Sequence, residues 1–482
     1  MEADPKKLQF LDALRGLAIL LVLMVHSGGL IELFGMKLSL TNFGQRGVQL
    51  FYEVSAFSLL YSYFSRGEAS WRAFFIRRFF RIAPLFYLSI AANLIYTVFI
   101  QRQPALPPLS YVAGILFLFG FHPSTINAIA PAGWSIAVEA TFYALFPIMA
   151  LTIRNLGSAL TLAAVAVLCC FFVCYTVVSY PLSALPLEYR HFLWFPVEFP
   201  VFCFGFVAFF AWRDLFMSAP QGWVLGGPFG LPMGRKGASA ALLILAGWTI
   251  LASFPVSNYR LYPNSLSFIF LILALALHPW SLFVNPATRL IGRMSFSIYL
   301  IHPYLSPFAS WVIDGLERSL SLHLYGHLLG LVVTFGAYFS GSLLISLVTF
   351  PFVEERGIAL GRNLIARIRE HIRYPARPGA VHTTMETKVE IPSVPAKLKT
   401  TYALWASSLV ALLLTISIYQ RVNPEAVSRP VAEYRKEIDA YQTQVQVLSA
   451  SVLENQRALK NTEQELKKAL DVITELRARP AG

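Results

Sequence analysis

The chain has 482 residues, of which 56% are hydrophobic and only 13% are charged, whereas a soluble domain usually carries about 25% charged residues. Its net charge of +13 is not accompanied by any nucleic-acid-binding motif, so no nucleic-acid partner is expected. The four cysteines show no metal-ligand spacing, and no metal is expected either. Long apolar segments recur over the first 350 residues, which predicts an all-α polytopic membrane protein.

The apolar pattern predicts ten membrane-spanning helices. The first is retained at the N-terminus, because no small-residue cleavage site follows it. A shorter apolar stretch, 111–121, is too brief to cross the membrane and is expected to be a re-entrant or interfacial piece on the outer side. The ten predicted spans are 8–27, 45–65, 80–100, 134–153, 158–179, 196–212, 239–253, 264–278, 295–313 and 327–352.

Arginine and lysine gather in alternate loops between these spans. The loops 66–79, 154–157, 213–238 and 279–294, together with the residues after 353, carry most of them. Because cytoplasmic loops are enriched in Lys and Arg, this bias predicts a cytoplasmic N-terminus in a plasma membrane, expected to be a bacterial inner membrane.

The residues beyond the ten spans predict a different architecture. Residues 1–362 form the predicted transmembrane domain, 363–400 a cytoplasmic basic segment and linker, and 401–420 an extra transmembrane helix. Residues 425–480 keep an apolar spacing of three and four residues, which predicts an extracytoplasmic coiled coil. A homo- or hetero-oligomer would follow from it, and a single amphipathic helix on the membrane surface is the alternative.

The first predicted helix carries two ionisable residues on one face. Arg15 and His26 are eleven residues apart, so they lie about 20° beyond three full turns and about 16 Å apart along the axis. Asp12 stands three residues before Arg15 and can pair with it. Taken singly, Arg15 fits a snorkelling residue and His26 an interfacial histidine. On one stripe, they are candidates for function, as ionisable residues at membrane depth usually are.

A second candidate is the stretch GWSIAVEATFYALFP at 133–147. Glu139 lies about a turn and a half into this apolar helix. The predicted topology puts it at the depth of His26, where a carboxylate would orient the imidazole and raise its basicity. The alternative is a glutamate that only holds helices together.

A third candidate is the arginine cluster in RAFFIRRFFRIAPLFY, 72–87. Arg77, Arg78 and Arg81 alternate with aromatic residues near a helix start. Guanidinium clusters of this kind suit phosphate-bearing ligands. The positive-inside rule alone would also place arginines here.

Two further stretches contain polar residues inside apolar segments. In LIGRMSFSIYLIHPY, 290–304, His302 follows Tyr299 within the ninth predicted span, and it fits a structural histidine as well as a substrate contact. In FPFVEERGIALGR, 350–362, the acidic pair Glu354 and Glu355 is expected to form an ion pair at the surface end of a helix.

These stretches, in this order, resemble the acyltransferase-3 family of membrane O-acyltransferases over residues 8–362. The motifs that carry the resemblance are the Arg15 to His26 spacing, GVQLFYEVSAF, IRRFFRIAP, WSIAVEATFY, SFSIYLIHP and FVEER. The chain departs from the family pattern at three positions: Gln49 stands where an Asp is usual, Ala56 where a Gly is usual, and Ala140 where a second Glu is common.

The resemblance implies transfer of an acyl group, expected to be acetyl, from cytoplasmic acyl-CoA to a hydroxyl of an extracytoplasmic glycan such as an exopolysaccharide or lipopolysaccharide. His26 is then the expected general base or transient acyl carrier, oriented by Glu139. The expected substrate-binding residues are Asp12, Arg15, Arg77, Arg78, Arg81, Trp134, Ser135, Tyr299 and His302.

Two other classes of function fit the same residues. A transporter or flippase of a glycan or anionic lipid would also place charges within the membrane. A scaffold whose coiled coil recruits partners of a glycan-assembly complex would make the tail the functional part.

Overall fold

The computed structural model describes residues 9–27, 31–33, 36–38, 44–66, 70–121, 129–179, 194–217, 225–226, 232–252, 261–320 and 328–372. These residues belong to the first of two compact units, residues 1–392. The predicted linker, extra transmembrane helix and coiled coil lie outside the described residues, and so does the side chain of Cys174.

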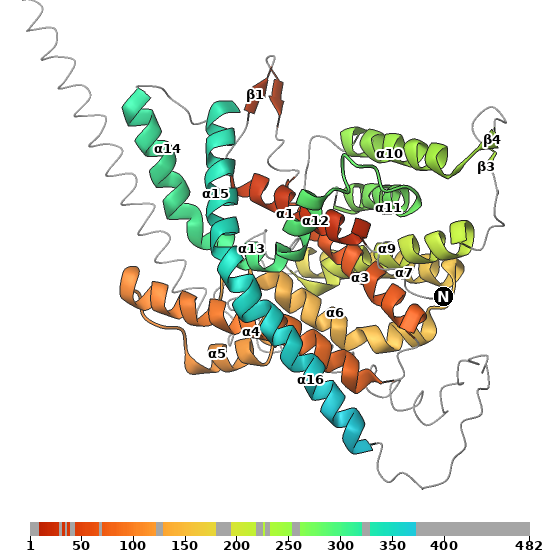
Figure 1. Ribbon diagram of the computed structural model, residues 1–482, viewed down its shortest axis with the longest axis horizontal. Coiled ribbons are helices and arrows are strands. Elements are labelled where there is room, and N and C mark those ends of the chain that lie inside the picture. Colours follow the sequence, from red (N-terminus) through yellow and green to blue (C-terminus); the bar gives the residue numbers. More distant parts are fainter. Residues whose placement is uncertain are drawn as a thin grey trace, which may run out of the picture. The chain divides into compact units, whose positions relative to one another are not determined.

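Helices make up nearly all of the described fold (Figure 1), which confirms the predicted all-α polytopic class. Two short antiparallel hairpins accompany them, β1 (Ile31–Leu33) with β2 (Met36–Leu38) and β3 (Leu225–Gly226) with β4 (Pro232–Met233). The α-helices are α1 (Gln9–His26), α3 (Gly47–Arg66), α4 (Trp71–Ile95), α5 (Pro108–Ile115), α6 (Gly133–Thr152), α7 (Leu156–Ser179), α9 (Phe195–Ala211), α10 (Arg235–Ala252), α11 (Leu261–Leu277), α12 (Pro286–Arg293), α13 (Ser295–Ile301), α14 (Ser306–Leu320), α15 (Leu328–Thr349) and α16 (Glu355–Ile372).

Short π- or 3₁₀-helical segments extend or join several of these helices. They are η2 (Tyr96–Ile100), η3 (Phe119–Phe121), η5 (Trp212–Met217), η8 (His302–Leu305) and η9 (Phe350–Glu354). Within the described residues, six helical runs are long and apolar enough to cross a membrane: Gln9–His26, Trp71–Ile100, Gly133–Thr152, Phe195–Leu215, Arg235–Ala252 and Leu329–Ile368. The total of ten spans stays a prediction.

Two predicted spans take shapes that hydropathy does not indicate. The ninth, 295–313, is broken into α13, η8 and α14. Pro303 lacks an amide hydrogen and its ring would clash in a regular α-helix, so the chain tightens into a 3₁₀ turn there. The tenth, 327–352, does not end at residue 352, because η9 joins α15 to α16 without a break. The stretch 111–121 forms only α5 and η3, both too short to cross.

The first helix packs closely against α12 and α3. A Cβ atom built on Gly292 would lie 1.7 Å from the Asp12 carbonyl oxygen, and one built on Gly16 would lie 2.2 Å from the Thr288 carbonyl oxygen. The two backbones therefore touch, as small residues allow between membrane helices. This contact places the helix that carries Arg15 directly beside the α12–α13 segment.

The α9 helix is buried on all sides between α3, α7 and α11. Phe202 stacks on Phe142 of α6 with ring centroids 3.9 Å apart. A Cβ atom on Gly205 would lie 2.4 Å from the Glu53 carbonyl oxygen, so α9 and α3 are also in backbone contact. These aromatic and glycine contacts hold α3 and α6 together around the candidate site.

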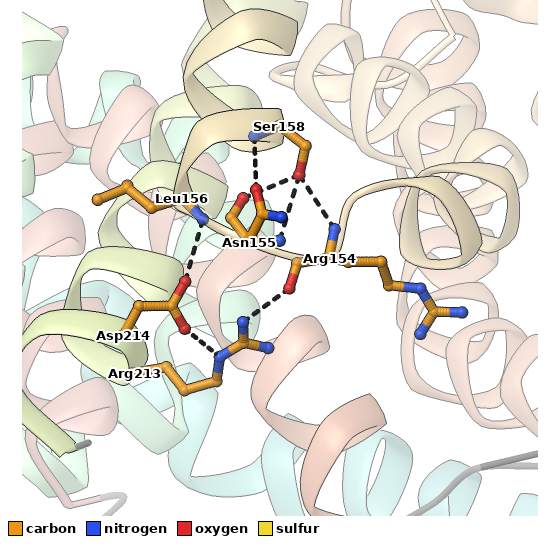
Figure 2. A network of polar contacts seen from close by, with 6 residues as sticks. All are labelled: Arg154, Asn155, Leu156, Ser158, Arg213 and Asp214. Carbon is orange, nitrogen blue, oxygen red and sulfur yellow. Dashed lines mark hydrogen bonds and ion pairs between the residues drawn. The ribbon is translucent and has the colours of Figure 1, made fainter.

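A polar network ties the turn before α7 to the end of α9 (Figure 2). The Asn155 side chain caps α7 by accepting from the Ser158 amide at 2.9 Å, and Asp214 accepts from the Leu156 amide at 3.0 Å. Arg213 bonds Asp214 at 2.6 Å and donates to the Arg154 carbonyl at 2.7 Å. Its guanidinium also lies 4.5 Å from the Phe210 ring centre. Arg213 and Asp214 both have hydrogen-bond partners, so we assign this network a structural role that connects α7 with the end of α9.

We predict that Gly292→Ala destabilises the folded chain. The added methyl group meets backbone atoms of α1, which cannot rotate away, so the α1–α12 contact must open. Gly247→Ala in α10 is the matched control, because a Cβ there meets nothing within 4 Å and Ala is the better helix former by roughly 0.5–1 kcal/mol. Thermal unfolding in detergent should show a lower midpoint for Gly292→Ala only; equal midpoints would refute the packing argument.

Candidate active site

The site begins on α1 with the pair Asp12 and Arg15. The Arg15 Nη1 atom donates to Asp12 Oδ1 at 2.9 Å, and Nη2 donates to the Ser58 hydroxyl of α3 at 3.2 Å. The Arg15 side chain is 18% exposed, so the guanidinium is largely enclosed by protein. It points into the helix bundle and is therefore not a residue that snorkels to the surface.

Polar contacts continue from Arg15 through α3 to α6. Ser58 donates to the Ser55 carbonyl at 3.0 Å, and the Ser55 hydroxyl donates to Glu139 Oε1, also at 3.0 Å. Tyr143, one turn further along α6, donates a second hydrogen bond to the same carboxylate oxygen. Arg15 and Glu139 thus share one continuous hydrogen-bonded chain.

The expected pairing of Glu139 with His26 is wrong in the described structure. The Glu139 carboxylate bonds Ser55 and Tyr143 and faces the arginines. The physical reason is depth: Glu139 lies a full turn beyond Ser135, and that extra turn of about 5.4 Å carries it away from the histidine and toward Arg15. The predicted membrane topology gives the direction of α6, but it does not give the axial offset of α6 relative to α1.

Three arginines converge at this end of the site. Arg78 and Arg81 on α4 lie close enough to Arg15 to act on it electrostatically. Arg78 lies over the Tyr143 ring at 5.6 Å, and its Nε atom is buried without a hydrogen-bond partner among the described residues. Arg77 is about 100° around the helix from Arg78 and engages other neighbours. Three guanidiniums in one place suit an anionic ligand with several oxygen atoms.

Glu354 joins this arginine cluster, although the sequence assigned it to a surface ion pair. That expectation is wrong for Glu354, which is 2% exposed and accepts from the Ser297 hydroxyl at 2.9 Å. Arg81 is its nearest cation. The cause is the continuation of the helix through η9 into α16, which packs on α4: Gly357 and Gly361 both face Phe80. In the sequence, Gly357 and Gly361 are four residues apart, and this spacing of small residues could have indicated a close contact between two helices.

A pair of histidines lies at the other end of the site. The rings of His26 and His302 are 4.7 Å apart between centroids. His26 is exposed at the end of α1, whereas His302 is 1% exposed. The Nδ1 atom of His302 lies 2.6 Å from the Tyr299 carbonyl oxygen, which can only accept, so Nδ1 carries the hydrogen. The Nε2 atom then presents a lone pair, and it has no hydrogen-bond partner among the described residues.

The first turn of α6 contacts this histidine end. Ser135 donates to the Tyr299 hydroxyl at 2.7 Å, and Tyr299 donates to the Ala132 carbonyl at 3.3 Å. Trp134 is buried beside Ser135. Since Ser135 and Glu139 are one turn apart on the same helix, α6 links the histidine end to the arginine end.

A second buried polar cluster joins α3 to α9. The Gln49 side-chain amide donates to the Glu198 carboxylate at 3.0 and 3.2 Å, and Arg46 is the cation nearest to that carboxylate. All three side chains are fully buried. Glu198 was not among the predicted site residues, although a lone carboxylate in the apolar run 195–211 is a usable signal. Among the described residues, no group of three or more His, Cys, Asp or Glu is placed to hold a metal ion.

A comparison with family models identifies the fold. The model of the acyltransferase-3 family, described as an acyltransferase domain, matches residues 8–350. The chain belongs to this family. It is accordingly an integral membrane protein, and the matched range contains every candidate site residue except Glu354.

Two bacterial relatives are similar to part of this chain. The peptidoglycan O-acetyltransferase OatA of Listeria monocytogenes is 27% identical over 152 residues, and the putative peptidoglycan O-acetyltransferase YrhL of Bacillus subtilis is 28% identical over 156 residues. In both cases the match covers 28% of this chain and 23% of the relative. No solved structure matches the chain.

We predict that Glu354→Ala lowers the stability of the folded chain and Glu355→Ala does not. Removing the buried carboxylate leaves the Ser297 hydroxyl without its acceptor, which costs about 1–3 kcal/mol for a buried polar group, and takes away a negative charge that acts on Arg81. Glu355 is the neighbouring residue and is exposed, so it is the matched control. The unfolding midpoints of the two purified variants test this prediction. Equal midpoints would contradict a stabilising role for the buried Glu354 carboxylate and would favour the predicted surface ion pair.

Proposed function

We propose that this chain is a membrane O-acyltransferase that moves an acyl group, in the first instance acetyl, from cytoplasmic acyl-CoA to a hydroxyl of an extracytoplasmic glycan. The observation that carries the proposal is the polar path through the bundle. It runs from the three converging arginines through Ser55 and Glu139 to the turn of α6 that bonds Tyr299, whose carbonyl in turn holds His302. Membership of the acyltransferase-3 family supports the same reaction.

The arginine end is the proposed site for the anionic part of acyl-CoA. Arg15, Arg78 and Arg81 supply guanidinium donors that match phosphate oxygens. Arg15 and His26 are about 16 Å apart along α1, so a ligand held at Arg15 must place its reactive group far from its phosphates. Acyl-CoA has this form, because its thioester ends a long, thin and uncharged arm.

The histidine end is the proposed site of chemistry. His26 is exposed at the end of α1 and accepts the proton of the glycan hydroxyl as that oxygen attacks the thioester carbonyl. The carbon–oxygen bond forms, the carbon–sulfur bond breaks, and the proton on His26 passes to the departing thiolate. His302 presents its Nε2 lone pair beside His26 and holds the imidazole or the hydroxyl in place. Glu139 acts at the other end, where it fixes Tyr143 against Arg78.

The surrounding architecture follows the sequence analysis. The proposed transmembrane domain is 1–362, followed by a linker at 363–400, a further span at 401–420 and an extracytoplasmic coiled coil at 425–480 that assembles copies or partners. The N-terminus is proposed to lie in the cytoplasm of a bacterial inner membrane. The two relatives named as peptidoglycan O-acetyltransferases favour a cell-wall glycan as acceptor over exopolysaccharide or lipopolysaccharide.

We predict that His26→Ala abolishes acylation while the protein still accumulates in the membrane. Loss of a general base reduces the rate by about 10²–10⁴-fold. His278→Ala is the matched control, because His278 lies in the loop after α11 and packs edge-on to Trp280. The measurement is transfer of label from radioactive acetyl-CoA to the glycan in isolated membranes. Undiminished transfer by His26→Ala would remove His26 from the chemistry, and movement of glycan without transfer would favour a flippase.

A further prediction concerns the anionic end. Arg78→Ala should weaken acyl-CoA binding by about tenfold, the effect of losing about 1.4 kcal/mol from one charge-assisted contact. Arg72→Ala is the matched control, because Arg72 lies six residues earlier on the same helix and is exposed. Equilibrium binding of acetyl-CoA to the purified variants distinguishes the two. If both substitutions weaken binding equally, these arginines only anchor the helix and set the net charge of the inner face.

A further inference from the structure

A pocket of about 350 Å³ opens beside the histidine end of the site. Three segments line it: the last turns of α4 with η2, the residues just before α6, and the turn from η8 into α14. Its volume lies within the usual range for small-molecule sites, about 300–1,000 Å³. With the N-terminus in the cytoplasm, α4 runs outward, so this pocket lies at the outer ends of its helices.

The lining of the pocket combines aromatic rings with uncharged polar groups. Tyr96 and Tyr304 meet edge to face at 6.5 Å between ring centroids. Asn93 and Gln101 add side-chain amides, and Ser306 adds a hydroxyl. No charged side chain is among the lining residues of the described structure. An anion would find no cation here, and a lipid chain would meet too many amides and hydroxyls.

Two of the polar lining residues are held in place by hydrogen bonds to backbone carbonyls. Tyr304 donates to the Ser89 carbonyl at 3.0 Å, which fixes its ring. Asn93 donates to the Ile129 carbonyl at 3.1 Å, which fixes its amide. A sugar ring offers the complement of this lining: C–H faces that pack on aromatic rings, and hydroxyls that pair with amides.

The pocket wall continues directly into the histidine cluster. Pro303 and Tyr304 are lining residues that immediately follow His302. Pro131, also in the lining, precedes Ala132, whose carbonyl accepts from Tyr299. A ligand in the pocket therefore lies against the same backbone segments that hold Tyr299 and His302. The Nε2 atom of His302, the residue just before this wall, is buried and has no hydrogen-bond partner among the described residues.

We propose that this pocket binds an uncharged saccharide unit of the acceptor glycan and presents its hydroxyl to the histidine pair. The inference rests on the proposed acyl transfer for its role, but the binding of a neutral sugar is a separate property that can be measured alone. It also gives the histidine end its direction, since the sugar arrives from the pocket side and the acyl arm from the arginine side.

The test fills the pocket. Ser310 of α14 is an exposed lining residue, and Ser310→Trp places an indole in the cavity. Ser319→Trp is the matched control on the exposed surface of the same helix, outside the lining. Binding of tri-N-acetylchitotriose and of maltotriose to the purified full-length chain is followed by saturation-transfer NMR. We expect the wild type and Ser319→Trp to bind at least one trisaccharide saturably, and Ser310→Trp to bind it at least tenfold more weakly.

A milder variant guards against misfolding. Gln101→Ala removes an exposed amide at the end of η2 and should weaken the same trisaccharide several-fold, with an unchanged elution profile in size-exclusion chromatography. Unaltered binding in both Ser310→Trp and Gln101→Ala, or no binding of either trisaccharide by the wild type, would overturn the proposal.

Acyl transfer from acetyl-CoA is measured in parallel to separate the two proposals. A chain that binds the sugar through this pocket but transfers no acetyl group refutes the proposed function and keeps the pocket. A chain whose acetyl transfer to the glycan is unaffected by Ser310→Trp and Gln101→Ala keeps the function and refutes the pocket.

Discussion

The arrangement of α1, α3 and α6 depends on one constraint, that an ionisable group inside the membrane is costly unless it finds a hydrogen-bond partner. Arg15 satisfies it through Asp12 and Ser58, and Glu139 through Ser55 and Tyr143. Hydrocarbon offers these groups no hydrogen bonds, so leaving any of them alone costs several kcal/mol. The same bonds that remove this cost lock α1, α3 and α6 in one register. Helix position and site geometry therefore have a common cause.

That register explains how one chain can hold two chemically different ends. The α6 helix contributes Ser135 to the histidine end and Glu139 to the arginine end, only one turn away. A small rotation or slide of α6 would move both contacts together. Proline at 303 then tightens the chain after His302 into a 3₁₀ turn, and the pocket lies where this turn passes into α14. A substitution that moves α6 at one end of the site is therefore expected to alter the contacts at the other end as well.

The sequence predicted much of the fold because hydropathy is local. The helix bounds near 8–27, 45–65 and 134–153 agree with α1, α3 and α6 to within a few residues. The face shared by Arg15 and His26 also follows from helical geometry alone. The partner of Glu139 did not follow, because the axial offset between two helices is set by packing and not by either helix. The burial of Glu354 was missed for a related reason, since hydropathy marks where apolar residues stop and says nothing of a helix that continues against a neighbour.

Two of the three departures from the family pattern, at Gln49 and Ala56, become intelligible in three dimensions. Gln49 stands where an Asp is usual, yet its amide donates to Glu198, so a carboxylate still lies beside Arg46, supplied by α9. Ala56 stands where a Gly is usual, and Gly205 faces it: a Cβ there would lie 2.8 Å from the Ala56 methyl group. In each case a residue lost from α3 is matched by one on α9. Because α3 and α9 touch along their backbones, an exchange of charge or volume between them preserves the contact, so these departures are compatible with an intact site.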